Sequence, residues 1–168
     1  MKVILYMAIS ANGYVAKEDD DTSWISKTEW DSYSAAVRNA GALIVGRRTY
    51  NILTKQPEFS EFEKVKIAVV SKGDFETLQP YHMLAKTPKE ALNLLSEFDH
   101  VIVAGGGILN ASFIKENIVD EIYLDIEPTL FGKGIKLFAD ADFEAKLKLL
   151  NMNKLSDDEV QLHYGVIK

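Results

Sequence analysis

The chain has 168 residues, of which 47% are hydrophobic and 26% charged, and it carries a formal net charge of −6 at pH 7. A chain of this size fits one domain spanning residues 1–168, and its negative charge argues against nucleic acid as the main partner, because binding to phosphates needs a basic face. The absence of cysteine excludes disulfides, thiolate metal sites and cysteine nucleophiles, and it is consistent with a reducing compartment.

The N-terminal part of the sequence predicts one buried strand, a loop and a helix. Residues 2–9 form a nearly continuous apolar run, which predicts a strand covered on both faces. The run is too short for a signal peptide and a turn follows it, and no stretch approaches the ~20 apolar residues that span a bilayer. We therefore expect a cytoplasmic protein with no membrane or metal partner. The acidic stretch Glu18–Asp21 predicts a solvated loop, and Ser26 is the expected N-cap of a helix over 26–39.

The rest of the chain alternates short apolar runs with helical patterns. Strands are predicted at 42–45, 65–70, 82–85, 101–104 and 121–126, helices at 47–53, 88–98 and 108–117, loops at 55–63 and 129–136, and a final antiparallel pair at 146–153 and 159–167. Strands that alternate with helices and end in a hairpin favour the α/β class, with a mixed, mostly parallel sheet between helices.

Two glycine-marked junctions stand out. Gly46-Arg47-Arg48-Thr49 follows the apolar run at 42–45, and Gly105-Gly106-Gly107 follows the run at 101–104. In an open α/β sheet, ligands bind beyond the carboxyl ends of strands, where helix N-termini offer free N–H groups to anions. Glycine allows close approach of the backbone, and arginine adds fixed positive charge. The two junctions together predict a long, phosphate-bearing ligand, for which a dinucleotide is the natural candidate.

Each junction also has a simpler interpretation. Three glycines can form a tight strand-to-helix turn without a ligand, and Asn110 occupies the place of the third spaced glycine in a dinucleotide fingerprint. The two arginines can be ordinary surface charges on an acidic protein. Ser71-Lys72, which ends a third strand, would extend the same cationic strip but carries no weight alone.

A proton donor is indicated by Trp24 and Glu29. A carboxyl group near an indole in an apolar cleft has its charged form disfavoured, which raises its pKa into a useful range for a proton donor. The alternative is that Glu29 belongs to a capping box at the start of the helix. Asp31 is a rival acid on the same predicted helix.

The order of these motifs resembles the dihydrofolate reductase fold. The resemblance rests on the first strand, Trp24, and the segments Ile44–Tyr50, Val69–Lys72 and Val103–Gly107. Segments 23–26, 119–124 and 128–134, with Leu137-Phe138, are similar to the reductase (C-terminal) domain of the riboflavin-biosynthesis deaminase–reductase. The resemblance spans nearly the whole chain and implies a three-layer α/β/α arrangement.

The resemblance implies that NADPH lies across the strand ends. Phosphates would contact Gly46, Arg47, Arg48 and Thr49, the adenosine 2′-phosphate would lie near Ser71 and Lys72, and the pyrophosphate would lie at Gly105, Gly106 and Gly107, followed by Ile108 and Leu109. The peptide bond between Gly105 and Gly106 would be cis, and Ala8 and Val15 would flank the nicotinamide. The candidate catalytic residues are Trp24, Glu29, which falls where dihydrofolate reductases carry their acid, and Asp125.

Several positions depart from both parent enzymes. Val65 occupies the place of the arginine that clamps the glutamate tail of folate, and Asp125 replaces the hydroxyl residue that helps to hold the pterin. Pyrimidine reductases usually carry arginines for the ribityl phosphate where this chain has Asp31 and Ser32. We therefore expect an NADPH-dependent reductase of a pteridine- or aminopyrimidine-like heterocycle, of dihydrofolate reductase or 5-amino-6-(5-phosphoribosylamino)uracil reductase type. The alternative is a non-catalytic NADP(H)-binding or regulatory protein, and a homodimer is expected by analogy.

Overall fold

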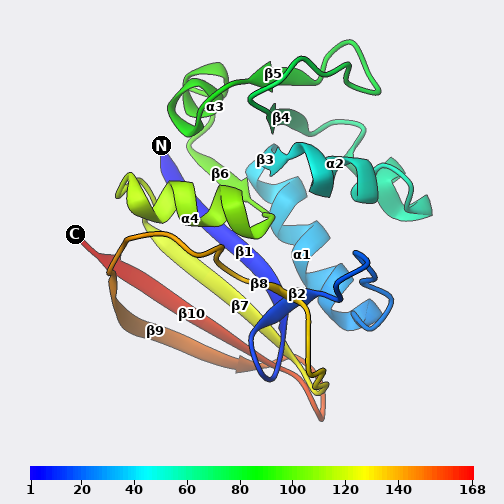
Figure 1. Ribbon diagram of the computed structural model, residues 1–168, viewed down its shortest axis with the longest axis vertical. Coiled ribbons are helices and arrows are strands. Elements are labelled where there is room, and N and C mark those ends of the chain that lie inside the picture. Colours follow the sequence, from blue (N-terminus) through cyan, green and yellow to red (C-terminus); the bar gives the residue numbers. More distant parts are fainter.

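An eight-stranded sheet forms the centre of the computed structural model, which describes all 168 residues (Figure 1). The strands lie in the order β5-β4-β3-β6-β1-β7-β10-β9. Their bounds are β1 Lys2–Ser10, β3 Ala42–Gly46, β4 Lys66–Val70, β5 Met83–Ala85, β6 His100–Val103, β7 Glu121–Glu127, β9 Lys146–Lys154 and β10 Val160–Ile167. The strands from β5 to β7 pair in parallel, whereas β10 is antiparallel to both β7 and β9. The predicted mixed, mostly parallel sheet with a C-terminal antiparallel pair is therefore confirmed.

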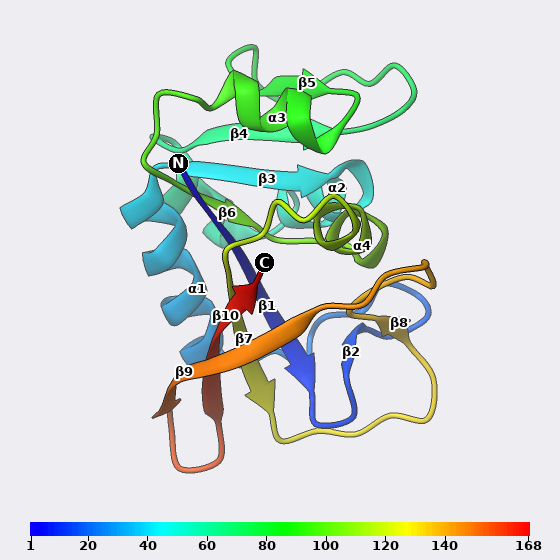
Figure 2. The ribbon, with the colours of Figure 1, turned by 90° about the vertical axis from the view of Figure 1, so that its left-hand side faces the viewer.

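Helices cover both faces of this sheet (Figure 2). They are α1 Lys27–Ala40, α2 Arg47–Leu53, α3 Pro88–Leu94, α4 Gly107–Lys115 and the 3₁₀ helix η1 Pro57–Phe62. One buried core lies between the sheet and α3 with α4, and a second lies between the sheet and α1, α2 and η1. None of the helices is long and apolar enough to cross a membrane.

Local sequence explains where helix α1 begins and ends. The hydroxyl of Ser26 accepts a hydrogen bond from the Glu29 backbone N–H at 3.0 Å, which caps the helix as predicted. The helix ends at Gly41, which has a φ of 71° in the left-handed region. Glycine suits this position because a β-carbon there would strain the backbone and lie 3.1 Å from the ring of Phe98.

Four predicted segments differ from the structure. The expected loop at 55–63 contains η1, which begins at Pro57, a residue well suited to the first turn of a helix. Helix α3 stops at Leu94 instead of residue 98, because the chain turns there to bury Leu95 completely in the core. The loop expected after the first strand, which includes Glu18–Asp21, and the loop expected at 129–136 contribute the short strands β2 Tyr14–Ala16 and β8 Ile135–Lys136, which pair with each other.

Candidate active site

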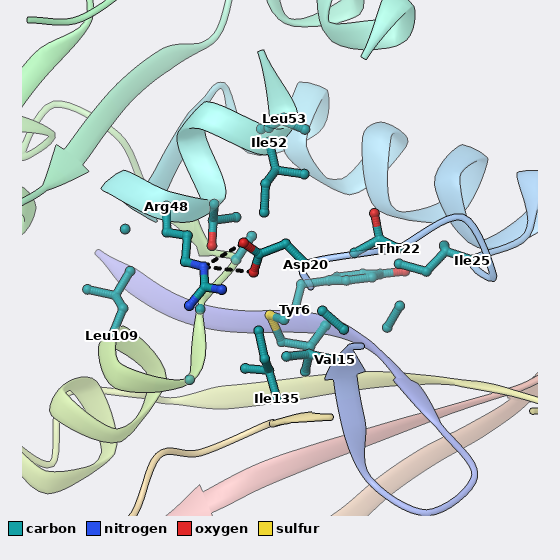
Figure 3. Close-up of a pocket in the computed structure, with 18 of the residues that line it drawn as sticks. Tyr6, Val15, Asp20, Thr22, Ile25, Arg48, Ile52, Leu53, Leu109 and Ile135 are labelled. Atoms are coloured by element: carbon teal, nitrogen blue, oxygen red, sulfur yellow. Dashed lines mark hydrogen bonds and ion pairs between the residues drawn. The ribbon is translucent and has the colours of Figure 1, made fainter. Parts of the chain in front are cut away.

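A cleft of about 1420 Å³ opens at the carboxyl ends of the parallel strands. Figure 3 shows Arg48 and Leu109 at one end, Thr22 and Ile25 at the other, and Tyr6 between them. Typical small-molecule sites enclose ~300–1,000 Å³. This cleft is therefore large enough to hold two ligands side by side, with an apolar floor from β1 and walls from α1, α2 and α4.

The two glycine junctions lie against each other in this cleft. The backbone N–H of Gly46 donates to the carbonyl oxygen of Gly105 at 2.7 Å. A β-carbon on Gly106 would lie 3.4 Å from the hydroxyl oxygen of Thr49, and the peptide bond between Gly105 and Gly106 is cis, as the resemblance implies. No side chain caps the N-terminus of α4. The two glycine junctions and the first backbone N–H groups of α4 therefore form one continuous surface that an anionic group can approach.

The cleft brings together nearly all the residues that the resemblance assigned to a cofactor. Those that line it are Ala8, Val15, Gly46, Arg47, Arg48, Thr49, Ser71, Lys72, Gly106, Gly107, Ile108 and Leu109. Gly105 does not line it: its carbonyl oxygen accepts the hydrogen bond from Gly46, and a β-carbon at this position would lie 3.0 Å from the side chain of Met7. Lys86 does line the cleft and was missed. The sequence could have indicated it, because Lys86 directly follows the predicted strand at 82–85 and so lies at the same edge of the sheet as Lys72.

Part of the acidic loop folds over the cleft, which corrects the prediction that this loop is merely solvated. The carboxylate of Asp20 accepts a hydrogen bond from Nε of Arg48 at 2.7 Å, as drawn in Figure 3. Asp21 pairs with Lys17 at 2.6 Å. The physical reason is charge: the loop brings Asp20 to the basic start of α2, where it neutralises a guanidinium that would otherwise face the cleft alone. Glu18 and Asp19 stay exposed, as predicted.

Glu29 is the buried acid of the cleft. Its side chain lines the cleft, is only 5% exposed, and accepts no hydrogen bond. The capping-box interpretation is wrong, because the backbone N–H of Ser26 donates to Glu127 instead, at 2.9 Å. Burial, followed by the charges of Asp125, Glu127 and Glu159, raises the pKa of Glu29 well above its usual range. The rival Asp31 is exposed and paired with Lys27 at 2.7 Å.

The other two candidate catalytic residues do not line the cleft. The indole N–H of Trp24 donates to the backbone oxygen of Asp21 at 3.1 Å. The expected rise in the pKa of Glu29 is present, and its largest cause is burial, as predicted; the charges of Asp125, Glu127 and Glu159, which were not foreseen, add to it.

Asp125 lies behind Tyr6, whose ring reaches the cleft (Figure 3). Its carboxylate accepts from the Tyr6 hydroxyl at 2.7 Å and from Gln161 Nε2 at 2.8 Å. Burial raises the pKa of Asp125 to about 6. Although several carboxylates gather here, no three acidic or histidine side chains are placed to hold a metal ion. The geometry makes Asp125 a positioning residue for Tyr6.

Comparison with known proteins agrees with this geometry. The sequence model of the family described as the RibD C-terminal domain matches residues 1–161. The uncharacterized protein YwjB of Bacillus subtilis (strain 168) is 30% identical over 172 residues, covering 97% of both chains. Dihydrofolate reductase type 1 of Escherichia coli is 35% identical over 132 residues, covering 76% of this chain and 78% of that protein.

Solved structures share the fold at lower identity. A putative riboflavin biosynthesis protein from Shewanella sp. PV-4 superposes with a TM-score of 0.82 at 21% identity, covering 100% of both chains. Dihydrofolate reductase from Enterococcus faecalis, complexed with NADP(H) and RAB-propyl, superposes with a TM-score of 0.77 at 14% identity, covering 99% of this chain and 97% of that one. The dihydrofolate reductase-like fold predicted from the sequence is therefore confirmed.

Proposed function

Because the chain belongs to the RibD C-terminal domain family, we propose that it is an NADPH-dependent reductase of a flat, pteridine- or aminopyrimidine-like heterocycle. The main support is that one cleft contains both the carboxyl group of Glu29, which has no hydrogen-bond partner, and the two glycine junctions 46–49 and 105–107, which pack together and which we call the double turn. The similarity to dihydrofolate reductases, and to one whose structure was solved in complex with NADP(H), supports the same chemistry. A role in riboflavin biosynthesis is one form of this proposal, suggested by the name of the Shewanella neighbour.

The residues at one end of the cleft fit a dinucleotide phosphate. The double turn offers backbone N–H groups, and Arg47, Arg48 and Lys72 offer positive charge at the ends of β3 and β4. Ala8 and Val15, both buried, form an apolar floor suited to a flat ring. When bound, NADPH would supply the hydride. The chain supplies orientation and excludes water from the floor of the cleft.

Glu29 would supply or route the proton. A carboxyl group whose pKa is raised by burial and neighbouring charges stays protonated at a higher pH than a free glutamic acid, so it can donate where a free glutamic acid is already ionised. No hydrogen bond inside the protein competes for its oxygens. Tyr6, fixed by Asp125 and Gln161, would hold the substrate ring in reach of this acid.

The function is tested by titrating the protein with NADPH and with NADH, and then following absorbance of the reduced nicotinamide in the presence of pteridines and aminopyrimidines. We expect a strong preference for NADPH and oxidation with at least one heterocycle. Equal affinity for the two cofactors would count against Arg48 and Lys72 reading the 2′-phosphate. Saturable binding without oxidation would favour the alternative, a non-catalytic NADP(H)-binding or regulatory protein.

The contact between Asp20 and Arg48 predicts an effect on cofactor affinity. In Asp20→Asn the guanidinium loses its competing carboxylate, so the Kd for NADPH is expected to fall ~2–5-fold, which matches the free energy of a partly exposed ion pair. The change is measured by titration of protein fluorescence. Glu18→Gln removes the same charge from an exposed neighbour in the same loop and serves as the control. Weaker binding by Asp20→Asn would show that Asp20 supports the site instead of competing for it.

We also propose that the protein is a homodimer that uses strand β9. This strand is one of the two edges of the sheet, and Leu147, Leu149, Leu150 and Met152 on it are 41–63% exposed. A long, apolar edge strand is a ready partner for a second copy. Light scattering should give the mass of a dimer for the native chain and of a monomer for Leu149→Lys/Met152→Lys. Leu78→Lys, at an exposed leucine elsewhere, is the control; a native monomer at all concentrations would exclude this dimer.

A further inference from the structure

The two ends of the cleft carry opposite charge. At the ends of β3, β4 and β5 the lining residues are mostly basic: Arg47, Arg48, Lys72 and Lys86. At the end bounded by α1 and η1, three carboxylates line the cleft against one ammonium group: Asp31, Glu58 and Glu61 against Lys27. The first end suits phosphates. The second end, which we call the acidic rim, repels anions.

No cation of the acidic rim is free to bind an anion. Lys27 is paired with Asp31 at 2.7 Å, and Arg38, which lies just outside the cleft, is paired with Glu61. Glu61 is further fixed by the indole N–H of Trp30 at 3.1 Å. By contrast, Arg47 and Lys72 at the basic end have no ion-pair partner. Even if the exposed Lys27–Asp31 pair opens, the rim keeps an excess of negative charge.

The neighbouring chain offers no substitute cation. Val65 is 3% exposed and packs in the core beneath α1 and η1, so no charged side chain stands at that position. Lys64 and Lys66 on either side of it are exposed and do not line the cleft. A carboxylate or phosphate that reached past the rim would therefore meet carboxylates with no compensating charge.

The inner part of this end is nonetheless built to receive a ligand. The carboxyl group of Glu29 is nine-tenths buried, faces the cleft and has no hydrogen-bond partner. A ligand in the cleft can therefore supply the hydrogen bond that the protein does not give this carboxyl group. A protonated acid at the inner end offers no positive charge to an anionic tail, and the carboxylates at the rim repel one, so this end of the cleft selects a ligand without negative charge.

Resting on the proposed reductase function, we infer that the substrate is a small, neutral or cationic flat heterocycle that carries no phosphate or carboxylate tail. Dihydrofolate and phosphoribosyl-substituted aminopyrimidines would then be poor substrates, and their tail-less counterparts the better ones. The discrimination comes from the side chains of α1 and η1, not from the part of the cleft that contacts the ring.

Matched ligand pairs test this inference. Dihydropterin is compared with dihydrofolate, and a ribosyl-aminopyrimidine with its phosphate ester, by kcat/KM with NADPH and by quenching of tryptophan fluorescence in the NADPH-loaded protein. We expect kcat/KM and affinity to be at least ~10-fold higher for the tail-less member of each pair, because an anionic tail beside the rim leaves water without gaining a cationic partner. Tail-bearing members that perform equally well or better would overturn the inference and leave the reductase standing.

A pair of charge reversals localises the effect. Glu58 lines the rim without an ion pair, whereas Glu63 is exposed one turn further along and does not line the cleft. Glu58→Lys should improve kcat/KM for the tail-bearing member ~3–10-fold, while Glu63→Lys, with the same net charge, should leave it unchanged. An equal increase in kcat/KM in both variants would contradict a local effect of the acidic rim. Preferential binding of tail-less ligands without turnover would support the inference and exclude the reductase, and no binding of any ligand would overturn both.

Discussion

Glu29→Gln is expected to lower kcat ~10²–10⁴-fold, the usual worth of a positioned general acid. Glutamine has nearly the same shape as glutamic acid, so the cleft keeps its form, but the amide cannot release a proton to the substrate. Because the carboxyl oxygens of Glu29 make no hydrogen bond within the protein, the substitution breaks none. The measurement is steady-state kcat with a saturating heterocycle and NADPH, together with a thermal melt of each variant.

The dependence of kcat on pH also tests whether Glu29 is the proton donor. The active form is the protonated acid, so kcat should be constant at low pH and fall as pH rises through the pKa of Glu29, which burial and the nearby carboxylates raise well above its usual range. Glu29→Gln should lose this alkaline limb. Stability follows the same shift: a folded-state pKa raised above the unfolded value gives stability that is present at low pH and lost as pH rises through the folded pKa. The variant should therefore be at least as stable as the native chain at neutral pH.

The rival acid provides the contrast. Asp31 is exposed and paired with Lys27, so Asp31→Asn should leave the alkaline limb of the pH profile in place. If Asp31→Asn removed that limb while Glu29→Gln retained it, the proton donor would be Asp31. A loss of both activity and stability in Glu29→Gln would point instead to a structural role.

Regular elements could be predicted from the sequence because their signals are local. Buried parallel strands appear as apolar runs, and the predicted bounds of helix α2, residues 47–53, coincide with those observed. The 3₁₀ helix η1 and the paired strands β2 and β8 were missed. Strands of two or three residues contain too few side chains to show a period of two, and their pairing joins segments more than a hundred residues apart.

The candidate site also contains residues that could be predicted from the sequence and others that could not. Residues at the ends of predicted strands, such as Gly46 and Lys72, could be assigned because the parallel sheet brings those ends to one edge. The environment of Glu29 could not be predicted from the sequence. Two of the carboxylates whose charges raise its pKa, Glu127 at the end of β7 and Glu159 just before β10, lie far from it along the chain. The contact of Asp20 with Arg48 could not be predicted either, because a run of acidic residues does not indicate which basic side chain it will pair with.

Gly107→Ala is expected to have the largest effect on stability of any glycine substitution in the cleft. A β-carbon on Gly107 would lie 2.6 Å from the backbone oxygen of Lys136 and 3.2 Å from the backbone nitrogen of Ala139. The backbone N–H of Ala139 also donates to the Gly107 carbonyl at 3.0 Å. Both contacts are with backbone, so no side-chain rotation relieves them, and the start of α4 must move away from β8 and the residues that follow it.

The cost of such overpacking is ~1–3 kcal/mol, which corresponds to a fall in Tm of ~2–4 °C for each kcal/mol in a chain of this size. NADPH affinity should fall as well, because Gly107 begins the helix whose N–H groups face the cleft. Calorimetry and cofactor titration measure the two effects. Gly132→Ala is the matched control, since a β-carbon there meets no atom within 4 Å, and it should leave both unchanged. A Gly107→Ala variant with native Tm and native affinity would show that α4 is not tightly held against this segment, and that the double turn owes its shape to other contacts.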